Sequence, residues 1–272
     1  MGLTLEVARG EVFGFLGPNG AGKTTTVKMM TGLIRPTSGR ISILGRPLGD
    51  KEARRRVGFL PEQFQFHEWL RADEFLDFHG SLYGMSKDER RARIPEVLEL
   101  VGLSGRTASR LDTFSKGMLQ RIGLAQALIA DPHLVFLDEP TSALDPIGRR
   151  DVRDIIHHLR ERGVTVFLNS HLLSEVEQVC DRAAIVRGGQ VLALGTMDDL
   201  LRTTEVVDVV ARGEADLGIS KLSRTLARAQ VIRFSEPYLR LNHALVLNRV
   251  QFARLALDKP VPSVVRGFTG SI

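Results

Sequence analysis

One eight-residue run constrains this chain more than any other part of its sequence, because a glycine-rich turn between a strand and a helix can fold in few ways. Residues 11–17, EVFGFLG, are an apolar run ending in glycine and predict a buried strand. A helix is predicted over residues 23–31, ended by Gly32 and Pro36. The turn between them fits the pattern G-x-x-x-x-G-K-[ST] at every fixed position, through Gly17, Pro18, Asn19, Gly20, Ala21, Gly22, Lys23 and Thr24.

The glycines of this run let the backbone curl so that successive N–H groups face inward around a polyphosphate. The predicted helix points the positive end of its dipole at the same place. Lys23 then reaches the outer phosphates, and the Thr24 hydroxyl ligates a magnesium ion. The run therefore predicts a phosphate-binding loop for a magnesium–nucleotide complex.

A second run, LVFLDE at residues 134–139, places two carboxylates at the end of an apolar strand. Four apolar residues in a row are typical of a parallel strand buried on both faces, and ligands gather at the carboxyl ends of such strands. We expect Asp138 to hold magnesium, directly or through water, and Glu139 to polarise the attacking water as a general base. Taken alone, two such acids are as typical of an ordinary helix cap. Together with the phosphate-binding loop they favour a catalytic role.

Strand and helix patterns alternate around these two motifs. Helical periodicity dominates residues 72–130, with breaks near Gly84 and over 102–113. The first 200 residues are therefore interpreted as an α/β sheet domain with a mostly helical insert. The remaining predicted strands are 39–44, 57–60, 133–137, 164–169 and a hairpin of 183–186 with 191–194; the remaining helices are 146–162 and 172–179. Beyond residue 203, strand-like runs at 206–212 and 230–234 flank a helical pattern at 217–229.

With these motifs placed, the chain resembles the nucleotide-binding subunit of an ATP-binding cassette (ABC) transporter from about residue 3 to residue 200. The resemblance adds Thr25 to the phosphate-binding loop. Gln63, in LPEQ, matches the glutamine that contacts magnesium and the attacking water and senses the membrane partner. His171 matches the switch histidine that contacts the γ-phosphate. The loop that links two active sites across a dimer is matched by Ser142-Ala143-Leu144-Asp145.

The family signature is usually written LSGGQ, and its counterpart here is Phe114-Ser115-Lys116-Gly117-Met118. The variant resembles cassettes of the ABC-2-type export branch, so the resemblance implies a working signature. Lys116 either adds positive charge near a γ-phosphate or points to solvent. Ser115 and Gly117, at the start of a predicted helix, also form a second anion site on physical grounds. Such a site makes sense if it closes over the nucleotide of another subunit, head to tail.

The resemblance implies an α/β fold: the P-loop NTPase sheet core of an ABC cassette, a helical subdomain insert and a small C-terminal α/β appendage. We expect a cassette at residues 1–202, with its helical subdomain at about 64–130, and an accessory domain at 203–272. ATP and Mg²⁺ are the implied cofactors. The implied partners are a second nucleotide-binding subunit and a polytopic membrane permease. The protein is expected at the cytoplasmic face of the cell membrane, where ATP hydrolysis would drive export of a substrate that the sequence does not identify.

Family members usually begin well upstream, with an edge strand and an aromatic residue that stacks on adenine. We therefore expect a truncated or misassigned start and weakened nucleotide binding, because stacking of a base on an aromatic ring contributes about 1–3 kcal/mol. The nearest aromatic residue is Phe13, which lies in the predicted strand 11–17 and is expected in the core.

Composition excludes several other classes of protein. Cys180 is the single cysteine, which excludes an internal disulfide framework or a multi-cysteine metal site and fits a reducing compartment. No apolar run approaches the roughly 18 residues of a membrane span, and the first residues lack the pattern of a secretory signal. Residues 201–272 hold 11 basic and 6 acidic residues and so account for the whole net charge of +5. Because these charges are scattered, they favour a solvated surface, and no nucleic-acid partner is expected.

Aromatic residues concentrate directly after Gln63. Of the sixteen in the chain, six lie between residues 64 and 83: Phe64, Phe66, Trp69, Phe75, Phe78 and Tyr83. The spacing of Phe75 and Phe78 favours the core of the helical insert. We expect some of Phe64, Phe66 and Trp69 to contribute to the groove in which the resemblance places a short helix of the membrane subunit.

Two other functions compete with a transporter motor. One is a soluble cassette ATPase acting on DNA or ribosomes, but such proteins usually carry two cassettes or a long coiled-coil arm. This chain has one phosphate-binding loop, and the interval from Gln63 to Ser115 is too short for such an arm. The other is a non-catalytic ATP-binding regulatory module, against which the presence of Lys23, Glu139 and His171 argues.

Overall fold

The computed structural model describes residues 3–63, 66–142, 144–202, 206–208 and 231–233; at residue 202 and in the last two stretches only the backbone is described. The chain divides into two compact units, Met1–Met197 and Asp198–Ile272. In the second unit, β9 (Val206–Asp208) and β10 (Val231–Arg233) pair in parallel, at positions where strands were predicted. The helix predicted at 217–229 lies outside the described residues, and the expected domains 1–202 and 203–272 stay predictions.

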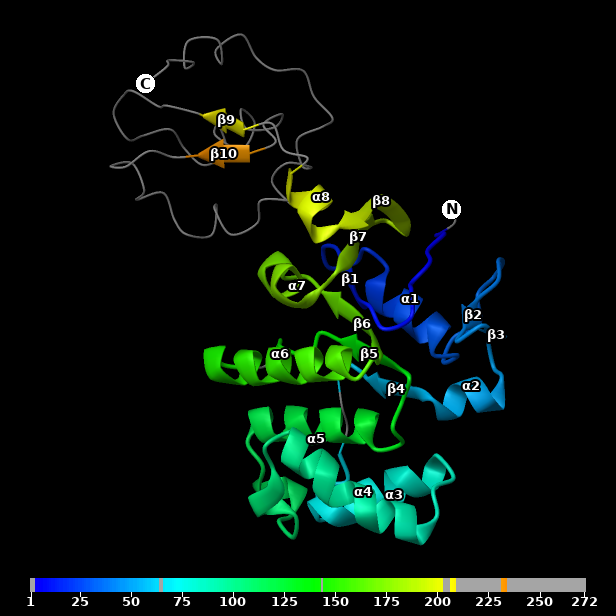
Figure 1. Ribbon diagram of the computed structural model, residues 1–272, viewed down its shortest axis with the longest axis vertical. Coiled ribbons are helices and arrows are strands. Elements are labelled where there is room, and N and C mark those ends of the chain that lie inside the picture. The colour runs from blue at the N-terminus through cyan, green and yellow to red at the C-terminus, as the bar shows by residue number, and fades with distance from the viewer. Residues whose placement is uncertain (1–2, 64–65, 143, 203–205, 209–230, 234–272) are drawn as a thin grey trace. The chain divides into compact units, whose positions relative to one another are not determined.

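The first unit is built on a six-stranded sheet with the order β4-β5-β6-β1-β7-β8 (Figure 1). Neighbouring strands of this sheet pair in parallel, except that β7 and β8 form the predicted antiparallel hairpin. All residues of β1, β5 and β6 are buried, as expected of parallel strands covered on both faces. The strands are β1 (Val12–Leu16), β4 (Val57–Leu60), β5 (Leu134–Asp138), β6 (Thr165–Ser170), β7 (Arg182–Arg187) and β8 (Gln190–Thr196).

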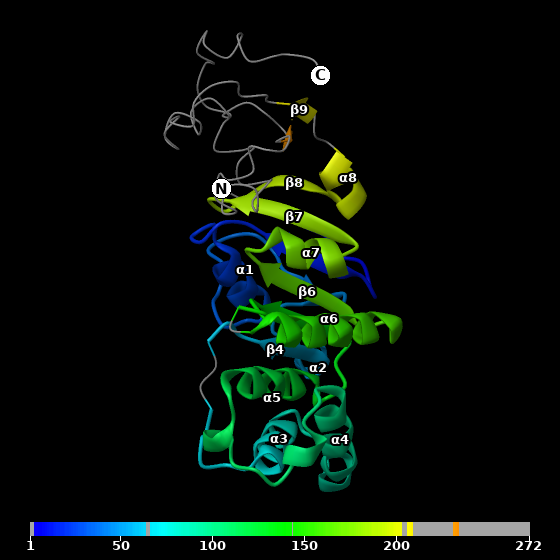
Figure 2. The same cartoon turned by 90° about the vertical axis from the view of Figure 1, so that its left-hand side faces the viewer.

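Helices α1, α6 and α7 pack against this sheet in both views (Figures 1 and 2). In α6 the buried residues Val152, Ile155, Ile156 and Leu159 recur at helical spacing, so one face of the helix is apolar. Burying each such side chain contributes about 1.5–3 kcal/mol, which holds α6 on the sheet. The helices are α1 (Lys23–Met30), α2 (Lys51–Arg55), α3 (Ala72–Leu82), α4 (Lys87–Leu100), α5 (Lys116–Leu128), α6 (Pro146–Glu161), α7 (Leu173–Val179) and α8 (Met197–Arg202).

Helices α3, α4 and α5 form a separate lobe below the sheet in Figures 1 and 2, with α5 packed on β4. This confirms the predicted helical insert and its breaks. Phe75 is buried in the lobe, as expected. The prediction that Phe78 is a core residue is wrong, because its side chain is 44% exposed. Three helical residues advance by about 300°, so Phe78 falls at the margin of the stripe that buries Phe75 and Leu76.

The core of the sheet domain is aromatic. Phe13 is fully buried, as predicted, and its ring lies 5.6 Å from that of Phe167, which also contacts Phe15 and Phe136. Cys180 is buried with its sulfur beside Gly14 of β1, and burial raises the pKa of its thiol. The strand predicted at 39–44 shrinks to β2 (Ser42–Ile43), which pairs with β3 (Arg46–Pro47). Within the described part of the chain, no helix combines the length and the apolar character needed to cross a bilayer.

Gly58 gives a test of the packing between β4 and α5. A Cβ at this position would lie 2.0 Å from the Ala127 carbonyl oxygen. We expect Gly58→Ala to reduce the free energy of unfolding by about 1–3 kcal/mol, because the helix backbone must move away. Urea denaturation measures the change. As a control, Gly105→Ala places its methyl where no atom lies within 4 Å, and equal losses in the two variants would contradict this packing.

Candidate functional site

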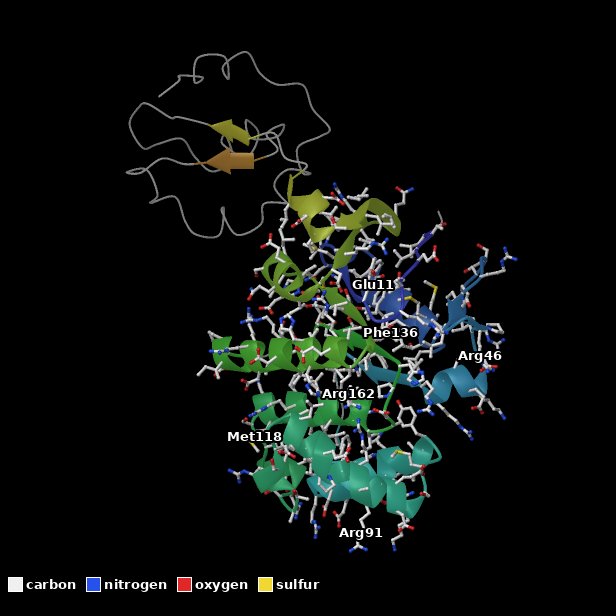
Figure 3. The ribbon with its side chains drawn as sticks, viewed as in Figure 1. Glu11, Arg46, Arg91, Met118, Phe136 and Arg162 are labelled. Carbon is white, nitrogen blue, oxygen red and sulfur yellow. The ribbon has the colours of Figure 1, made fainter. Side chains whose placement is uncertain are left out.

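The strand order brings three chain segments to one edge of the sheet. β6 lies between β5 and β1, and the three are parallel, so their carboxyl ends are neighbours. The loop 17–22 follows β1, Asp138 ends β5, and His171 follows β6. Figure 3 labels Phe136 on β5, two residues before Asp138, in the middle of the sheet domain. This edge is where parallel sheets bind ligands.

The loop 17–22 has the geometry of a phosphate cradle. Gly22 caps α1 with a left-handed backbone, φ +95°, which favours glycine and turns the chain into the helix. Lys23 is 6% exposed, and its ammonium donates to the Gly17 carbonyl oxygen at 2.8 Å, so the charge sits inside the loop. A polyphosphate in this cradle meets that ammonium and the free N–H groups at the start of α1. Thr25 lies exposed in the first turn of the same helix.

Asp138 and Thr24 present oxygens to one another across this edge. The Thr24 hydroxyl donates to Asp138 Oδ1 at 3.5 Å. Burial raises the pKa of the Asp138 carboxyl, while hydrogen bonds from Asn169 and Thr24 act in the opposite direction. Hydroxyl and carboxylate oxygens are the ligands that Mg²⁺ prefers, so this pair fits the ion that accompanies ATP. The described residues contain no cluster of three or more His, Cys, Asp or Glu side chains suited to a metal.

Glu139 joins the lysine of the loop to the histidine after β6. Its Oε1 lies 3.9 Å from Lys23 Nζ and its Oε2 lies 2.8 Å from His171 Nδ1. Glu139 is 6% exposed, and its backbone is left-handed, with φ 51°. Holding a non-glycine residue there costs of order 1–3 kcal/mol, and such strain occurs mostly at functional sites. The carboxylate is therefore held between a cation and an imidazole at the edge where phosphate would lie.

Asn169 is a site residue that the sequence analysis missed. It is fully buried at the end of β6, where its amide donates to Asp138 Oδ1 and its backbone carbonyl accepts from the Glu139 N–H at 2.9 Å. The Asn169 Oδ1 atom has no partner among the described residues. One asparagine thus holds both acids of the site. The signal available in the sequence is its position two residues before His171. Only the pairing of Asn169 with Asp138 across β5 and β6 shows that this position belongs to the site.

The structure does not bring every predicted site residue into these contacts. Gln63 is exposed three residues after β4, and its neighbour Glu62 lies close enough for its charge to help raise the pKa of Asp138. Ser115 caps α5 by accepting from the Met118 N–H at 3.3 Å. Figure 3 shows Met118, in the first turn of α5, far from α1, which Figure 1 labels in the same view. The signature and the phosphate-binding loop of one chain therefore lie apart, on the helical lobe and on the sheet domain.

The loop 142–145 lies between the two acids and α6. Within it, Ala143 is outside the described residues. The Ser142 N–H donates to the Glu139 carbonyl oxygen at 3.2 Å, and Asp145 caps α6 by accepting from the Gly148 N–H at 2.7 Å. A Cβ built on Gly117 would lie 3.6 Å from Leu144 Cδ2, so the leucine packs over the signature glycine. The loop thus touches both the acid end of β5 and the start of α5.

An aromatic surface lies on the helical lobe. We use that name for Trp69, Phe78 and Leu82, which are 67%, 44% and 68% exposed, together with His67, whose ring lies 5.1 Å from Trp69 and 6.1 Å from Phe78. Burial, helped by the neighbouring His67, lowers the pKa of His79 to about 4, so the lobe carries a neutral imidazole beneath this surface at neutral pH. Phe64 lies outside the described residues and Phe66 is half-buried.

Comparisons with known proteins agree with this geometry. The family described as ABC transporter matches residues 1–142. An uncharacterized ABC transporter ATP-binding protein of Synechocystis sp. is 50% identical over 84% of this chain and 65% of its own length. The bacitracin transport ATP-binding protein BcrA of Bacillus licheniformis is 46% identical over 70% of this chain and 62% of its own length. The chain thus spans less than two thirds of these curated relatives.

A solved structure gives the same result for the fold. The ATP-binding cassette MJ0796, described as a dimer in a post-hydrolysis state bound to ADP and Pi, superposes with a TM-score of 0.65. It is 28% identical, and the match covers 71% of this chain and 88% of that one. The predicted fold class, a P-loop sheet core with a helical insert, is confirmed for the described cassette.

The contacts of Asn169 predict a role in magnesium affinity. We expect Asn169→Leu, which keeps the branched shape of the side chain but removes the amide, to weaken Mg²⁺ binding by about 10-fold or more, as loss of an outer-shell partner does. The measurement is a Mg²⁺ titration of the binding of a fluorescent ATP analogue. Thr165→Val, another buried polar change on β6, is the control and should leave the titration unchanged. A wild-type Mg²⁺ dependence in Asn169→Leu would contradict the assignment.

Proposed function

This chain belongs to the ABC transporter family, and from that premise we propose that it binds ATP with Mg²⁺, hydrolyses the γ-phosphate bond and drives a separate membrane permease. The observation that carries the proposal is the convergence of Lys23, Asp138, Glu139 and His171 at one edge of the sheet. The bacitracin transport protein, named for transport and ATP binding, supports the assignment to a transport motor.

The contacts at this edge suit an in-line attack by water. Lys23 neutralises charge on the outer phosphates, and Thr24 with Asp138 holds the magnesium ion of the substrate. Glu139, with its carboxylate fixed between Lys23 and His171, accepts the proton of the attacking water. His171 orients Glu139 and contacts the γ-phosphate. Gln63, on the exposed segment after β4, reports the state of this site to the helical lobe.

A second copy of the chain completes the site in this proposal. Ser115 and Gly117 begin α5, where free N–H groups and the helix dipole attract an anion, but this helix start lies far from α1 of the same chain. A head-to-tail dimer brings the signature of each copy onto the nucleotide of the other. The solved cassette that is described as a dimer bound to ADP and Pi supports dimer formation in this proposal.

Glu139→Gln tests the enzymatic half of the proposal. The amide keeps the size of the side chain but cannot accept a proton, so we expect phosphate release to fall by at least 100-fold while ATP binding is retained. Phosphate release and binding of a fluorescent ATP analogue are measured on the full chain, alone and together with its membrane partner. We also expect Glu139→Gln to form an ATP-dependent dimer in light scattering.

An equal lack of hydrolysis in wild type and Glu139→Gln, with nucleotide still bound, would favour the non-catalytic module instead. Asp198→Asn, on the second compact unit, serves as a matched removal of one carboxylate and should leave hydrolysis unchanged.

We place the permease contact on the aromatic surface and the protein at the cytoplasmic face of the cell membrane. Trp69 and Phe78 lie on either side of the His67 contacts, and Leu82 lies one helical turn after Phe78. Exposed apolar side chains gathered in this way are typical of interaction sites, and aromatic residues are enriched in interfaces. The surface follows Gln63 in the chain, so a motion that begins at the nucleotide passes directly to it. Closure of the dimer then pulls the membrane helices.

Affinity capture of tagged Glu139→Gln from gently solubilised native cells, with ATP present, tests this contact. We expect a polytopic membrane protein to be recovered and its yield to fall at least tenfold when Trp69→Ser and Leu82→Ser are added. Leu33→Ser, at a residue that is 64% exposed elsewhere on the chain, is the control and should not lower the yield. Recovery of ribosomal or DNA-bound proteins without a membrane protein would favour the soluble ATPase.

A further inference from the structure

One buried carboxylate, on the helix that follows β6, has no role in the mechanism above. Glu175 lies in the first turn of α7 and is 5% exposed. Its two oxygens face two arginines of α6: Oε1 lies 3.8 Å from Arg149 and Oε2 lies 3.5 Å from Arg153. Taking a carboxylate out of water is costly unless charges compensate it, so Glu175 fixes α7 to these arginines.

Arg149 makes a second contact that leads toward the nucleotide edge. Its Nε donates to the Leu144 carbonyl oxygen at 3.2 Å, while its terminal nitrogen faces Glu175. Leu144 is buried, and its side chain packs over Gly117 at the start of α5. One guanidinium therefore joins the loop 142–145 to α7. Because the guanidinium is planar and rigid, a displacement of one contact moves the other.

Glu175 is only four residues after His171, and the segment between them is short. The Leu172 N–H donates to Ser170 Oγ at 3.0 Å, and the Glu175 N–H donates to the Leu172 carbonyl oxygen at 3.2 Å. His171 in turn holds Glu139 at 2.8 Å. Side-chain contacts thus run from Gly117 through Leu144 and Arg149 to Glu175. The short backbone segment 171–175 then joins Glu175 to the histidine that contacts Glu139.

We propose that Arg149 is a positioning residue that couples the loop 142–145 to His171 through Glu175. When a second copy of the chain docks on the loop 142–145, the shift of Leu144 passes through Arg149 to the start of α7 and sets the distance between His171 and Glu139. ATP hydrolysis then requires docking of the second copy, and nucleotide binding alone is not sufficient. This inference rests on the proposed ATP hydrolysis and adds a route by which dimer closure reaches the general base.

Arg153 provides a matched control, since it contacts the same carboxylate from the same helix. Arg149→Gln removes the contacts to both Glu175 and Leu144, whereas Arg153→Gln leaves the Leu144 hydrogen bond in place. We expect Arg149→Gln to lower kcat about tenfold with KM for MgATP within twofold of wild type, because positioning of the reacting groups is lost while binding is kept. Arg153→Gln should stay within twofold in both constants, and thermal unfolding of the two variants should coincide.

Amide hydrogen exchange gives a readout that does not depend on activity. In Arg149→Gln, exchange should rise at least threefold in residues 141–145 and also in 171–175, because one side chain ties the two segments. In Arg153→Gln, residues 141–145 should exchange at the wild-type rate. Equal exchange in the two variants, or equal kcat values in an active preparation, would overturn the coupling. A wild type that hydrolyses no ATP would count against the proposed function, and exchange would still decide whether the link exists.

Discussion

The proposed chemistry of this protein depends on a lysine ammonium that is almost completely excluded from water, in the loop that follows a buried strand. Lys23 is 6% exposed, and a charge in that position is stable only with partners at close range. The Gly17 carbonyl oxygen at 2.8 Å and Glu139 at 3.9 Å supply them. The carboxylate directly follows β5, two strands away from β1, so the parallel order β5-β6-β1 is what brings this partner to the ammonium. The order of the strands therefore determines whether the lysine can be buried where a phosphate would bind.

The same burial explains why the acids need so much support. Asp138 is 1% exposed and is held by Thr24 and Asn169, and Glu139 has a left-handed backbone that the Asn169 carbonyl helps to fix. Strain of order 1–3 kcal/mol at Glu139 persists only because the surrounding hydrogen bonds leave it no easier conformation. In the proposed mechanism, a general base held this way loses little freedom when water and phosphate bind, which is the advantage of a preorganised site.

The parts of the site that sequence predicts are those carried by short contiguous runs. The phosphate-binding loop, the strand before Asp138 and the helix after Gly22 follow from local rules on glycine and apolar periodicity, and the structure has these elements. Asn169 is missed because its contacts arise from cross-strand register, and the proposed role of Arg149 arises from two helices packing together; no local pattern contains either. The prediction for Phe78 is wrong for a related reason. Helical spacing indicates which residues share a face of α3, but it does not indicate where the buried part of that face ends.

The separation of the phosphate-binding loop from the signature is the reason why the proposed regulation passes through the interior of the chain. The phosphate-binding loop lies on the sheet domain and the signature begins α5 of the helical lobe, so the proposed dimer is what would bring both of them to one nucleotide. If two copies share each nucleotide, the free energy of nucleotide binding is spent partly on closing the dimer. In this proposal, closing the dimer must also change the position of Glu139, whose side chain is buried within its own chain at 6% exposed. Side chains that bridge the loop 142–145 and the segment after β6 are the physical means available, because packed elements with charged links move together.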